Sequence, residues 1–355
     1  MSYIAKGKPW DYQGAVDVSD CTTSSEAMQK ANLAFKVEKC ELVAKMPIKF
    51  NNADEEIDAA LNLQKHGGHI YGKDAYAPCE NAYATYRTDF NIPLGIVKNK
   101  FTPVQNTEAF AFFDNAIGKN RAIWQTAGFF GNGERIFVSA KLPDNILVNG
   151  DPVENYLVFT NNHDGNGGVK ILFTPIRVVC QNSLNAAIRG ANNYISFRHT
   201  NNVHSKINVA QEILGISQVK TKELNEYYNF LSTIKMTDDE VMEYITQTVL
   251  TDDERMLLHN TGHTNKELFY RSYSAVQDAK ISTRKLNVIC DTWDYYQGGI
   301  GQKEIAGTAW GAANAVSGYY SNVDNSIGIK RMDSILYGDK SRKIETAFSM
   351  AGVLS

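Results

Sequence analysis

Long apolar runs are missing from this sequence, and their absence excludes the simplest membrane architectures. No run of about 18 apolar residues occurs, so no transmembrane helix is expected. The N-terminus, MSYIAKGKPWDYQG, has no apolar core of the kind that a secretory signal needs. Cysteine is also sparse, with five residues scattered over 355 positions and no CxxC pair. This pattern indicates neither a disulfide framework nor a cysteine metal site, and it predicts a protein of the reducing cytoplasm.

Nucleotide and hydrolase signatures are absent too. The stretch GFFGNG is not GxGxxG, and neither GxxxxGK[ST] nor GxSxG occurs. The pairs His66/His69 and His259/His263 have no third ligand close by in the sequence, so metal binding is not expected at either. We therefore predict no metal site and no cofactor.

The overall charge limits the kind of partner. The formal net charge is −3, and charged residues make up 21% of the chain. Such a near-neutral balance argues against a protein that coats nucleic acid with its whole surface. Any binding of an anionic polymer must therefore be confined to a patch.

One segment has the charge that such a patch would need. Residues 161–206 hold a single acid, Asp164, and a formal charge of +4. The bases of this segment are Lys170, Arg177, Arg189, Arg198 and Lys206. An excess of base in an acidic chain indicates an anionic partner, and a polynucleotide is the commonest one.

Periodicity and turn residues predict an α+β fold, in which an antiparallel sheet of β-hairpins carries a helical C-terminal subdomain. One hairpin turns at Gly131-Asn132-Gly133 and the other at Asp164-Gly165, a favoured tight-turn pair. Capping boxes at Thr23-x-x-Glu26 and Thr237-x-x-Glu240 predict helix starts. Residues 52–80 are glycine-rich with weak periodicity and are expected to form surface loop.

These patterns divide the chain into three parts. Residues 1–80 form an N-terminal segment, residues 81–206 a β-rich core with the basic cluster, and residues 207–355 the helical subdomain. Residues 223–254 hold nine acids and one lysine, so acidity gathers in the helical part.

The aromatic residues of the C-terminal part are expected to pack in the core or, alternatively, at a subunit interface: Trp293, Tyr295, Tyr296, Trp310, Tyr319 and Tyr320.

The sequence RVVCQN offers two chemical interpretations at the end of a strand. Cys180 could be a nucleophile whose thiol pKa is lowered by a helix N-terminus, with His163 and Asp164, or His199, as partners. Alternatively, Arg177, Gln181 and Asn182 could cradle an anion. A third possibility is a buried, unreactive cysteine with ordinary turn residues around it. The apolar strand before Cys180 favours burial, because both of its faces are expected to be covered.

A second constellation lies in YISFRHTNNVHSK. Arg198, His199 and Lys206 are close together at a strand-to-helix passage, where Arg, His and Asn side chains suit phosphate contacts. Tyr194 and Phe197 could stack on bases. An ordinary polar loop is the alternative. With Lys170, Arg177, Asn182 and Arg189, these residues are our candidates for nucleic-acid binding.

Several blocks together resemble a known family. LAFKVEKCELVAK, VFTNNHDGNGGVKILFTPIRVVCQNSL, ISFRHT and GTAWGAANAVSGYY stand in the order found in phage/plasmid-like proteins that carry domain of unknown function 932. The resemblance covers residues 23 to 338 and implies a phage or mobile-element protein, without an activity that transfers residue by residue. Single-stranded DNA is the natural partner in phage replication and recombination.

Three hypotheses follow for the function. The first is a homo-oligomeric protein that binds single-stranded DNA, as an annealing or replication accessory factor without enzymatic activity. The second is a thiol-dependent enzyme that uses Cys180 with a histidine. The third is a counter-defence protein that captures a host protein through its acidic helices.

Overall fold

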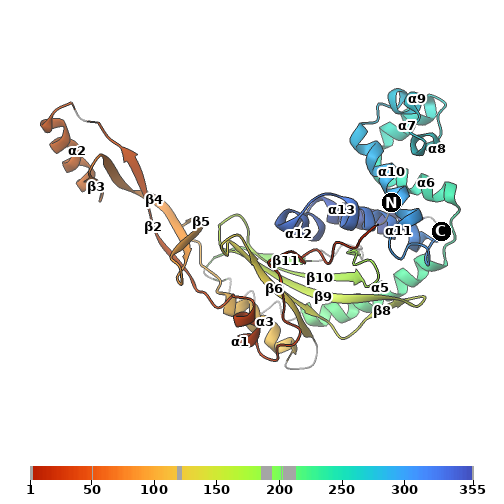
Figure 1. Cartoon of the computed structure of the whole chain (residues 1–355), viewed down its shortest axis with the longest axis horizontal. Helices are drawn as coiled ribbons and strands as arrows, with labels where there is room; N and C mark the ends of the chain where they lie inside the picture. Colours follow the sequence, from red (N-terminus) through yellow and green to blue (C-terminus); the bar gives the residue numbers. More distant parts are fainter. Residues whose placement is uncertain are drawn as a thin grey trace.

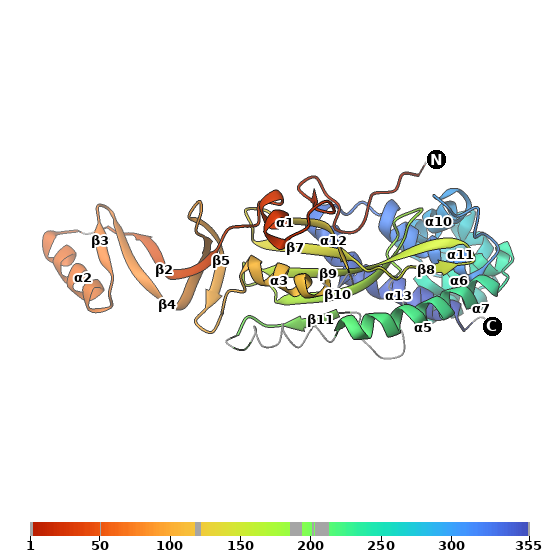
Figure 2. The same ribbon diagram turned by 90° about the horizontal axis from the view of Figure 1, so that it is seen from below.

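The chain forms a large body and a projecting arm. The computed structural model describes residues 3–49, 51–117, 122–184, 194–200, 202 and 213–353. Figure 1 shows the arm extending away from the body on one side, and Figure 2 shows the same extension from below. Within the described ranges the architecture is α+β, with antiparallel sheets and helices gathered in the C-terminal part, which confirms the predicted fold class.

The body is built on an antiparallel sheet, which has seven strands among the described residues. Their order is β1-β6-β7-β9-β10-β11, with β8 beside β9. The strands are β1 (Val16–Asp17), β6 (Ile123–Phe130), β7 (Arg135–Lys141), β8 (Ile146–Val148), β9 (Asp151–Asn162), β10 (Val169–Arg177) and β11 (Tyr194–Phe197).

Both predicted hairpins are confirmed. β6 and β7 pair as far as Phe130 and Arg135 across a turn in which Gly131 has a φ of 63°. β9 and β10 pair across a turn in which Gly165 has a φ of 81°. Glycine is favoured at both positions because it has no Cβ to clash in the left-handed region.

Helices and the N-terminal segment cover the two faces of this sheet. Leu157 and Phe159 of β9 belong to the larger apolar core, which also contains the buried side chains of α5 and α11. The alternate residues Tyr156 and Val158 pack in a smaller core with Trp10 and with α12. Since both faces are covered, the central strands are almost entirely buried, as expected from the apolar strand before Cys180.

The helices of the body are mostly C-terminal. They are α1 (Ser24–Lys30), α3 (Asn106–Ile117), α5 (Ile213–Thr233), α6 (Asp238–Val249), α7 (Asp252–Asn260), α8 (Asn265–Phe269), α9 (Tyr273–Asp278), α10 (Thr283–Gly298), α11 (Ala309–Gly318), the π-helix η2 (Tyr319–Val323), α12 (Gly328–Leu336) and α13 (Asp339–Ala351). Thr23 and Thr237 form the predicted capping boxes at the starts of α1 and α6.

Helix α11 is the centre of the helical part, because all ten of its residues are buried. The six aromatic residues noted in the C-terminal sequence are each at most 9% exposed, which confirms that they pack in the core. None of the helices in the described ranges combines the length and the apolar content that crossing a bilayer requires.

The arm is a second antiparallel sheet, and it corrects one prediction. β2 (Val37–Pro47) lies along β4 (Asp74–Arg87), while β3 (His69–Tyr71) and β5 (Ile92–Lys98) pair with the two ends of β4 on its other side. Helix α2 (Ala53–Lys65) lies at the tip (Figure 1).

The expected loop over residues 52–80 is therefore wrong. Asn52 accepts a hydrogen bond from the backbone N–H of Glu55 (2.9 Å) and so caps α2. No residue of α2 is buried, which explains why the sequence has no clear apolar period there. The boundary drawn after residue 80 falls inside β4, because the arm is one continuous sheet across it.

Candidate nucleic-acid interface

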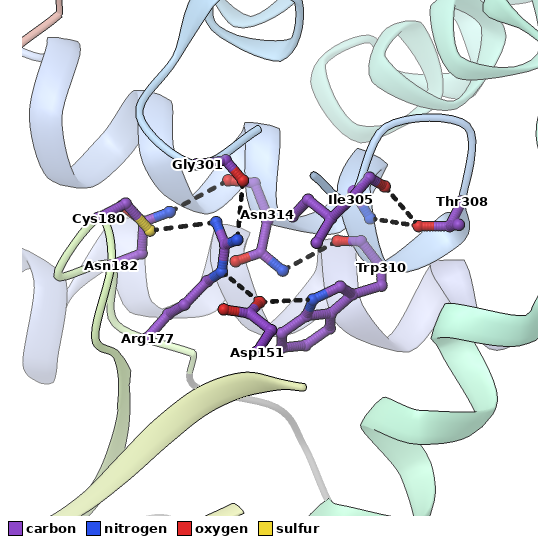
Figure 3. Close-up of polar contacts among 10 residues, drawn as sticks. Asp151, Arg177, Cys180, Asn182, Gly301, Ile305, Thr308, Trp310 and Asn314 are labelled. Carbon is purple, nitrogen blue, oxygen red and sulfur yellow. Dashed lines mark hydrogen bonds and ion pairs between the residues drawn. The ribbon is translucent and has the colours of Figure 1, made fainter. Parts of the chain in front are cut away.

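Arg177 is a buried structural residue. Its side chain is 1% exposed, and its Nε donates to Oδ2 of Asp151 at 2.5 Å. The two terminal nitrogens donate to the Cys180 sulfur (3.5 Å) and to the carbonyl oxygen of Gly301 (2.8 Å), as Figure 3 shows. The indole N–H of Trp310 also donates to Asp151 (3.1 Å). A phosphate on the surface cannot reach this guanidinium, so Arg177 does not serve as a surface contact.

A hollow of about 520 Å³ lies beside this pair. Asp151, Arg177 and Trp310 line it, but Arg177 and Trp310 are each 1% exposed. A molecule in the hollow would therefore meet backbone and rim side chains such as Lys235 rather than the guanidinium or the indole.

Cys180 is buried, as the sequence predicted. Its exposed fraction is 0%, and burial raises the pKa of its thiol, with the nearby Arg177 guanidinium acting in the opposite direction. A thiol with a raised pKa and no access to solvent is a poor nucleophile. The geometry favours the interpretation of Cys180 as a small packed residue.

The proposed Cys180–histidine pairs are wrong, because strand register separates the residues. Arg177 lies opposite Val153 at one end of the β9–β10 hairpin, whereas His163 follows the last residue of β9 at the other end. Ten residues of extended strand between Val153 and His163 span about 33 Å. His199 lies at the same distant end, since Phe197 pairs with Val169. Neither histidine can exchange a proton with the thiol.

Asn182 is buried as well. Its Nδ2 donates to the carbonyl oxygen of Asn314 (3.3 Å), and its Oδ1 accepts from Asn322 (2.8 Å). Residues 181–184 are not helical, and Ser183 bridges back to Ile176 of β10. The described part of this segment therefore provides no helix N-terminus for an anion cradle. The remainder of the predicted helix, with Arg189, lies outside the described residues, and so does Lys206.

Lys170 is half-buried over an aromatic surface. Its ammonium lies 4.3 Å from the ring centroid of Tyr337 and 5.8 Å from that of Tyr194. Burial lowers the pKa of Lys170, although the carboxylate of Asp333 acts in the opposite direction. Lys170 therefore packs between the sheet and a helix of its own chain, and its ammonium is only partly exposed to solvent.

His163 and His199 lie where the arm joins the body. Nε2 of His163 is 3.0 Å from Oδ1 of Asn106, and burial together with the charge of His199 lowers its pKa to about 3. Nδ1 of His199 is 3.1 Å from the carbonyl oxygen of Thr102, and the ring stacks on Phe101 at 4.4 Å. Burial lowers the pKa of His199 too. Both rings are structural parts of the junction.

Arg198 is the predicted base that the structure leaves exposed, and it has neighbours that the sequence did not single out. The backbone N–H of Thr102 donates to the carbonyl oxygen of His199 (3.3 Å), which places the segment that carries Lys100 beside the segment that carries Arg198. Lys98 begins the turn that ends at Phe101. Nζ of Lys39 donates to the carbonyl oxygen of Asn99 (2.8 Å). We call Lys39, Lys98, Lys100 and Arg198 the junction cluster.

The junction cluster is accessible and unpaired among the described residues. Lys98, Lys100 and Arg198 are exposed, and Lys39 is half-buried over the ring of Tyr83, 4.8 Å from its centroid. None of the four forms an ion pair with a described acid. Asp164 and Glu108 are the acids near enough to His199 to favour its charged form. KNKF at 98–101 was the available sequence clue, since it places two bases beside an aromatic residue.

The histidine pairs outside the junction have other contacts. His69 stacks on Tyr76 at 5.2 Å. His263 lies 3.0 Å from a carboxylate oxygen of Asp278 and 2.7 Å from one of Glu267, and these bonds raise its pKa. Among the described residues, His, Cys, Asp and Glu form no group of three or more that could hold a metal ion.

Comparison with known proteins places the chain in a family. The family model described as Domain of unknown function (DUF932) matches residues 93–348, well over half of the sequence, and the chain belongs to this family. The matched span includes the body sheet from β6 onward and nearly all of the C-terminal helices, but not β2 or β4 of the arm. No curated protein and no solved structure matches the chain.

Proposed function

We propose that this member of the DUF932 family binds single-stranded nucleic acid, with single-stranded DNA favoured, through the junction cluster. One observation carries the proposal: three exposed bases and one half-buried base, from three separate segments, gather where the arm leaves the body. No described acid pairs with any of them, so their charge is available to a ligand.

Phosphate groups suit these side chains. Lysine ammonium and arginine guanidinium groups are the usual contacts of a nucleic-acid backbone, and the gain comes from the release of condensed counterions. Such contacts carry no sequence information, so binding is expected to be tolerant of sequence.

Aromatic rings beside the bases support a single-stranded ligand in particular. Phe101 is partly exposed next to Lys100, with one face of its ring against His199, and Tyr83 lies under Lys39. Unpaired bases stack on such rings, whereas the bases of a duplex are already stacked on each other. The combination of a basic surface with neighbouring aromatic side chains is typical of proteins that bind single strands.

The distribution of acids elsewhere supports the same location. Helix α6 begins with Asp238, Asp239 and Glu240, and α7 begins with Asp252, Asp253 and Glu254. A polyanion is repelled from that region. In Figure 1 these helices lie across the body from the arm, so the ligand and the acidic surface are kept apart.

A salt titration tests the proposal. Fluorescence anisotropy with a labelled oligothymidylate at several salt concentrations should give a slope of log Kobs against log salt of about −2 to −3, on the rule of about −0.7 per neutralised phosphate. The variant Lys98→Ala/Lys100→Ala should lose about half of that slope. Lys235→Ala is the matched control, because Lys235 is exposed at the edge of the acidic helices. It should bind as the wild type does.

Two outcomes would overturn the proposal. The first is no binding to any oligonucleotide at about 50 mM salt, at which phosphate contacts are strong. The second is equal weakening per charge removed by the lysine variant, which loses two charges, and by Lys235→Ala, which loses one. That would mean that the charge of the whole protein acts rather than the junction cluster. Either result would leave a protein partner as the better account.

A further inference from the structure

We infer that two copies of this chain pair through the outer edge of β2, so that the two arms form one continuous antiparallel sheet. The inference rests on the arm alone and does not depend on nucleic-acid binding. The binding partner of β2 is therefore β2 of a second copy of this chain.

The distal arm has almost no core of its own. Over residues 42–49 and 51–80, Gly68 and Ala75 are the buried residues. Large apolar side chains are exposed there instead, namely Val43 (46%), Met46 (40%), Ile57 (56%), Leu61 (52%) and Tyr71 (76%). A small sheet of three or more strands is independently stable only when it has a packed apolar face or a helix against it. The arm therefore gains stability when another surface covers it.

The edge of β2 is available for pairing. β4 pairs with one side of β2 along its whole length, and no described strand pairs with the other side. At the proximal end, the side chain of Gln105 bonds to both the N–H and the C=O of Val37 (3.0 and 2.9 Å). Beyond Val37, no described strand covers the outward main-chain groups of this edge, and an uncovered edge is a template for strand addition.

The contact with Gln105 also defines which residues point outward. Since the main-chain groups of Val37 face away from β4, those of Lys39, Glu41, Val43 and Lys45 do so as well. The irregularity near Leu42 does not alter this order. Leu42 is the single β2 residue between the paired positions Glu41 and Val43, and the extra residues belong to β4, where 79–82 lie opposite it. In a twofold antiparallel pair, outward residues face outward residues of the second copy.

Charge and the position of Gln105 together favour one register. A twofold axis through Cys40 would place Lys39 opposite Glu41, but it would also require pairing at Val37, whose outward main-chain groups are already bonded to Gln105. If the twofold axis passes through Glu41, the two Glu41 side chains lie opposite each other. If it passes through Leu42, Lys39 lies opposite Lys45. If it passes through Val43, Glu41 of each copy lies opposite Lys45 of the other, and this pairing occurs twice. Opposite charges directly across a strand pair are stabilising and like charges are destabilising.

The remaining pairs of the Val43-centred register are compatible with it. Cys40 lies opposite Met46, and Leu42 opposite Ala44, so apolar side chains meet apolar side chains. Lys45 already pairs with Asp74 of the neighbouring strand β4 at 2.9 Å, and in the dimer its ammonium would lie between two carboxylates. Pro47 has no N–H to donate and limits the paired stretch to residues 39–47.

Cysteine cross-linking tests the register. In a Cys21→Ser/Cys40→Ser/Cys79→Ser background, Val43→Cys places two thiols across the axis with Cα atoms about 5.5 Å apart, within the range that a disulfide spans. Mild oxidation should convert most of the protein to a covalent dimer. Met46→Cys is the matched control, because Met46 is similarly exposed (40% against 46% for Val43) but would lie about 20 Å from its copy.

Sedimentation of the full chain tests the association itself. The wild type should be a dimer, and Glu41→Lys should raise the dimer Kd roughly tenfold, because it creates two like-charge pairs. Glu41→Gln should have a smaller effect. Circular dichroism would verify that each variant folds, as expected for exposed positions. A monomeric wild type, or equal cross-linking through positions 43 and 46, would overturn the inference.

Discussion

Thr85 of the arm donates its hydroxyl hydrogen to the main-chain carbonyl oxygen of His163 in the body, at 2.6 Å. Both residues are buried, and Gly95 on the neighbouring strand lies so close to Asp164 that an added Cβ would be 2.4 Å from its backbone. The arm is thus joined to the β9–β10 turn through main-chain contacts. Together with the bond from Arg87 to the carbonyl oxygen of Asn132, these contacts hold the arm against the body sheet.

Replacing Thr85 by Val should destabilise the protein by about 1–3 kcal/mol, because the buried carbonyl oxygen of His163 would lose its donor. Thr85→Ser keeps the hydroxyl and should cost less. Urea denaturation of the two variants would measure the difference. Equal stability of Thr85→Val and the wild type would show that the bond is not important.

Breaking the buried ion pair should be more severe. Arg177→Met leaves Asp151 without its partner, and the expected loss is about 3–5 kcal/mol. The double variant Arg177→Met/Asp151→Leu removes both charges and should recover part of that loss. Denaturation curves of the single and double variants decide the matter. Affinity for oligonucleotides should change little in any variant that folds, since Arg177 is not on the surface.

Cys180 should be inert in the native protein. Its pKa is raised and the side chain is fully buried, so a thiol reagent should modify Cys40, which is exposed, long before Cys180. Mass spectrometry of peptides after brief labelling would give the order. Rapid modification of native Cys180 would contradict the structural assignment and restore the enzyme hypothesis.

Acid should destabilise the junction through His163. Its pKa is about 6.5 when unfolded and about 3 when folded, so the folded state holds the neutral ring. The stabilising contribution is complete above pH 6.5 and is lost as the pH falls from 6.5 towards 3, at up to about 1.4 kcal/mol per pH unit. His163→Gln should have a shallower dependence over this range. Urea midpoints at a series of pH values would show it, and parallel curves would refute the assignment.

Arg198→Ala should weaken oligonucleotide binding equally for all sequences and reduce the salt slope by about 0.7. The reason is that a phosphate contact is insensitive to the base. Anisotropy titrations with oligothymidylate and with a mixed-sequence strand would test both parts. A loss confined to one sequence would indicate contact with a base instead.

The parts of the fold that the sequence predicted depend on neighbouring residues. Thr23 and Thr237 cap helices with a glutamate three residues later, and Gly165 turns a hairpin whose strands follow directly. The distal part of the arm, over residues 52–80, was missed because α2 buries none of its residues and therefore has no apolar period to detect.

The site was harder to predict, because burial and proximity arise from distant pairing. Arg177 meets Asp151 across 26 positions, and Lys39 meets Asn99 across 60. A basic residue in a sequence gives no indication of whether a carboxylate will cover it. Arg198 was found because it lies in a locally basic segment, whereas Lys39 joins the junction cluster only through the pairing of β2 with β4.

The length of β4 has an electrostatic consequence. Arg87, at its proximal end, is fixed to the body by a hydrogen bond to the carbonyl oxygen of Asn132 (2.7 Å) and lies over the ring of Phe35. The fourteen residues from there to Asp74 span about 46 Å at about 3.3 Å per residue. At physiological ionic strength charges are screened over about 8 Å. The electrostatic effect of the acidic helices on the tip of the arm is therefore negligible. A partner that binds at the tip is not repelled or attracted by the charge of the body.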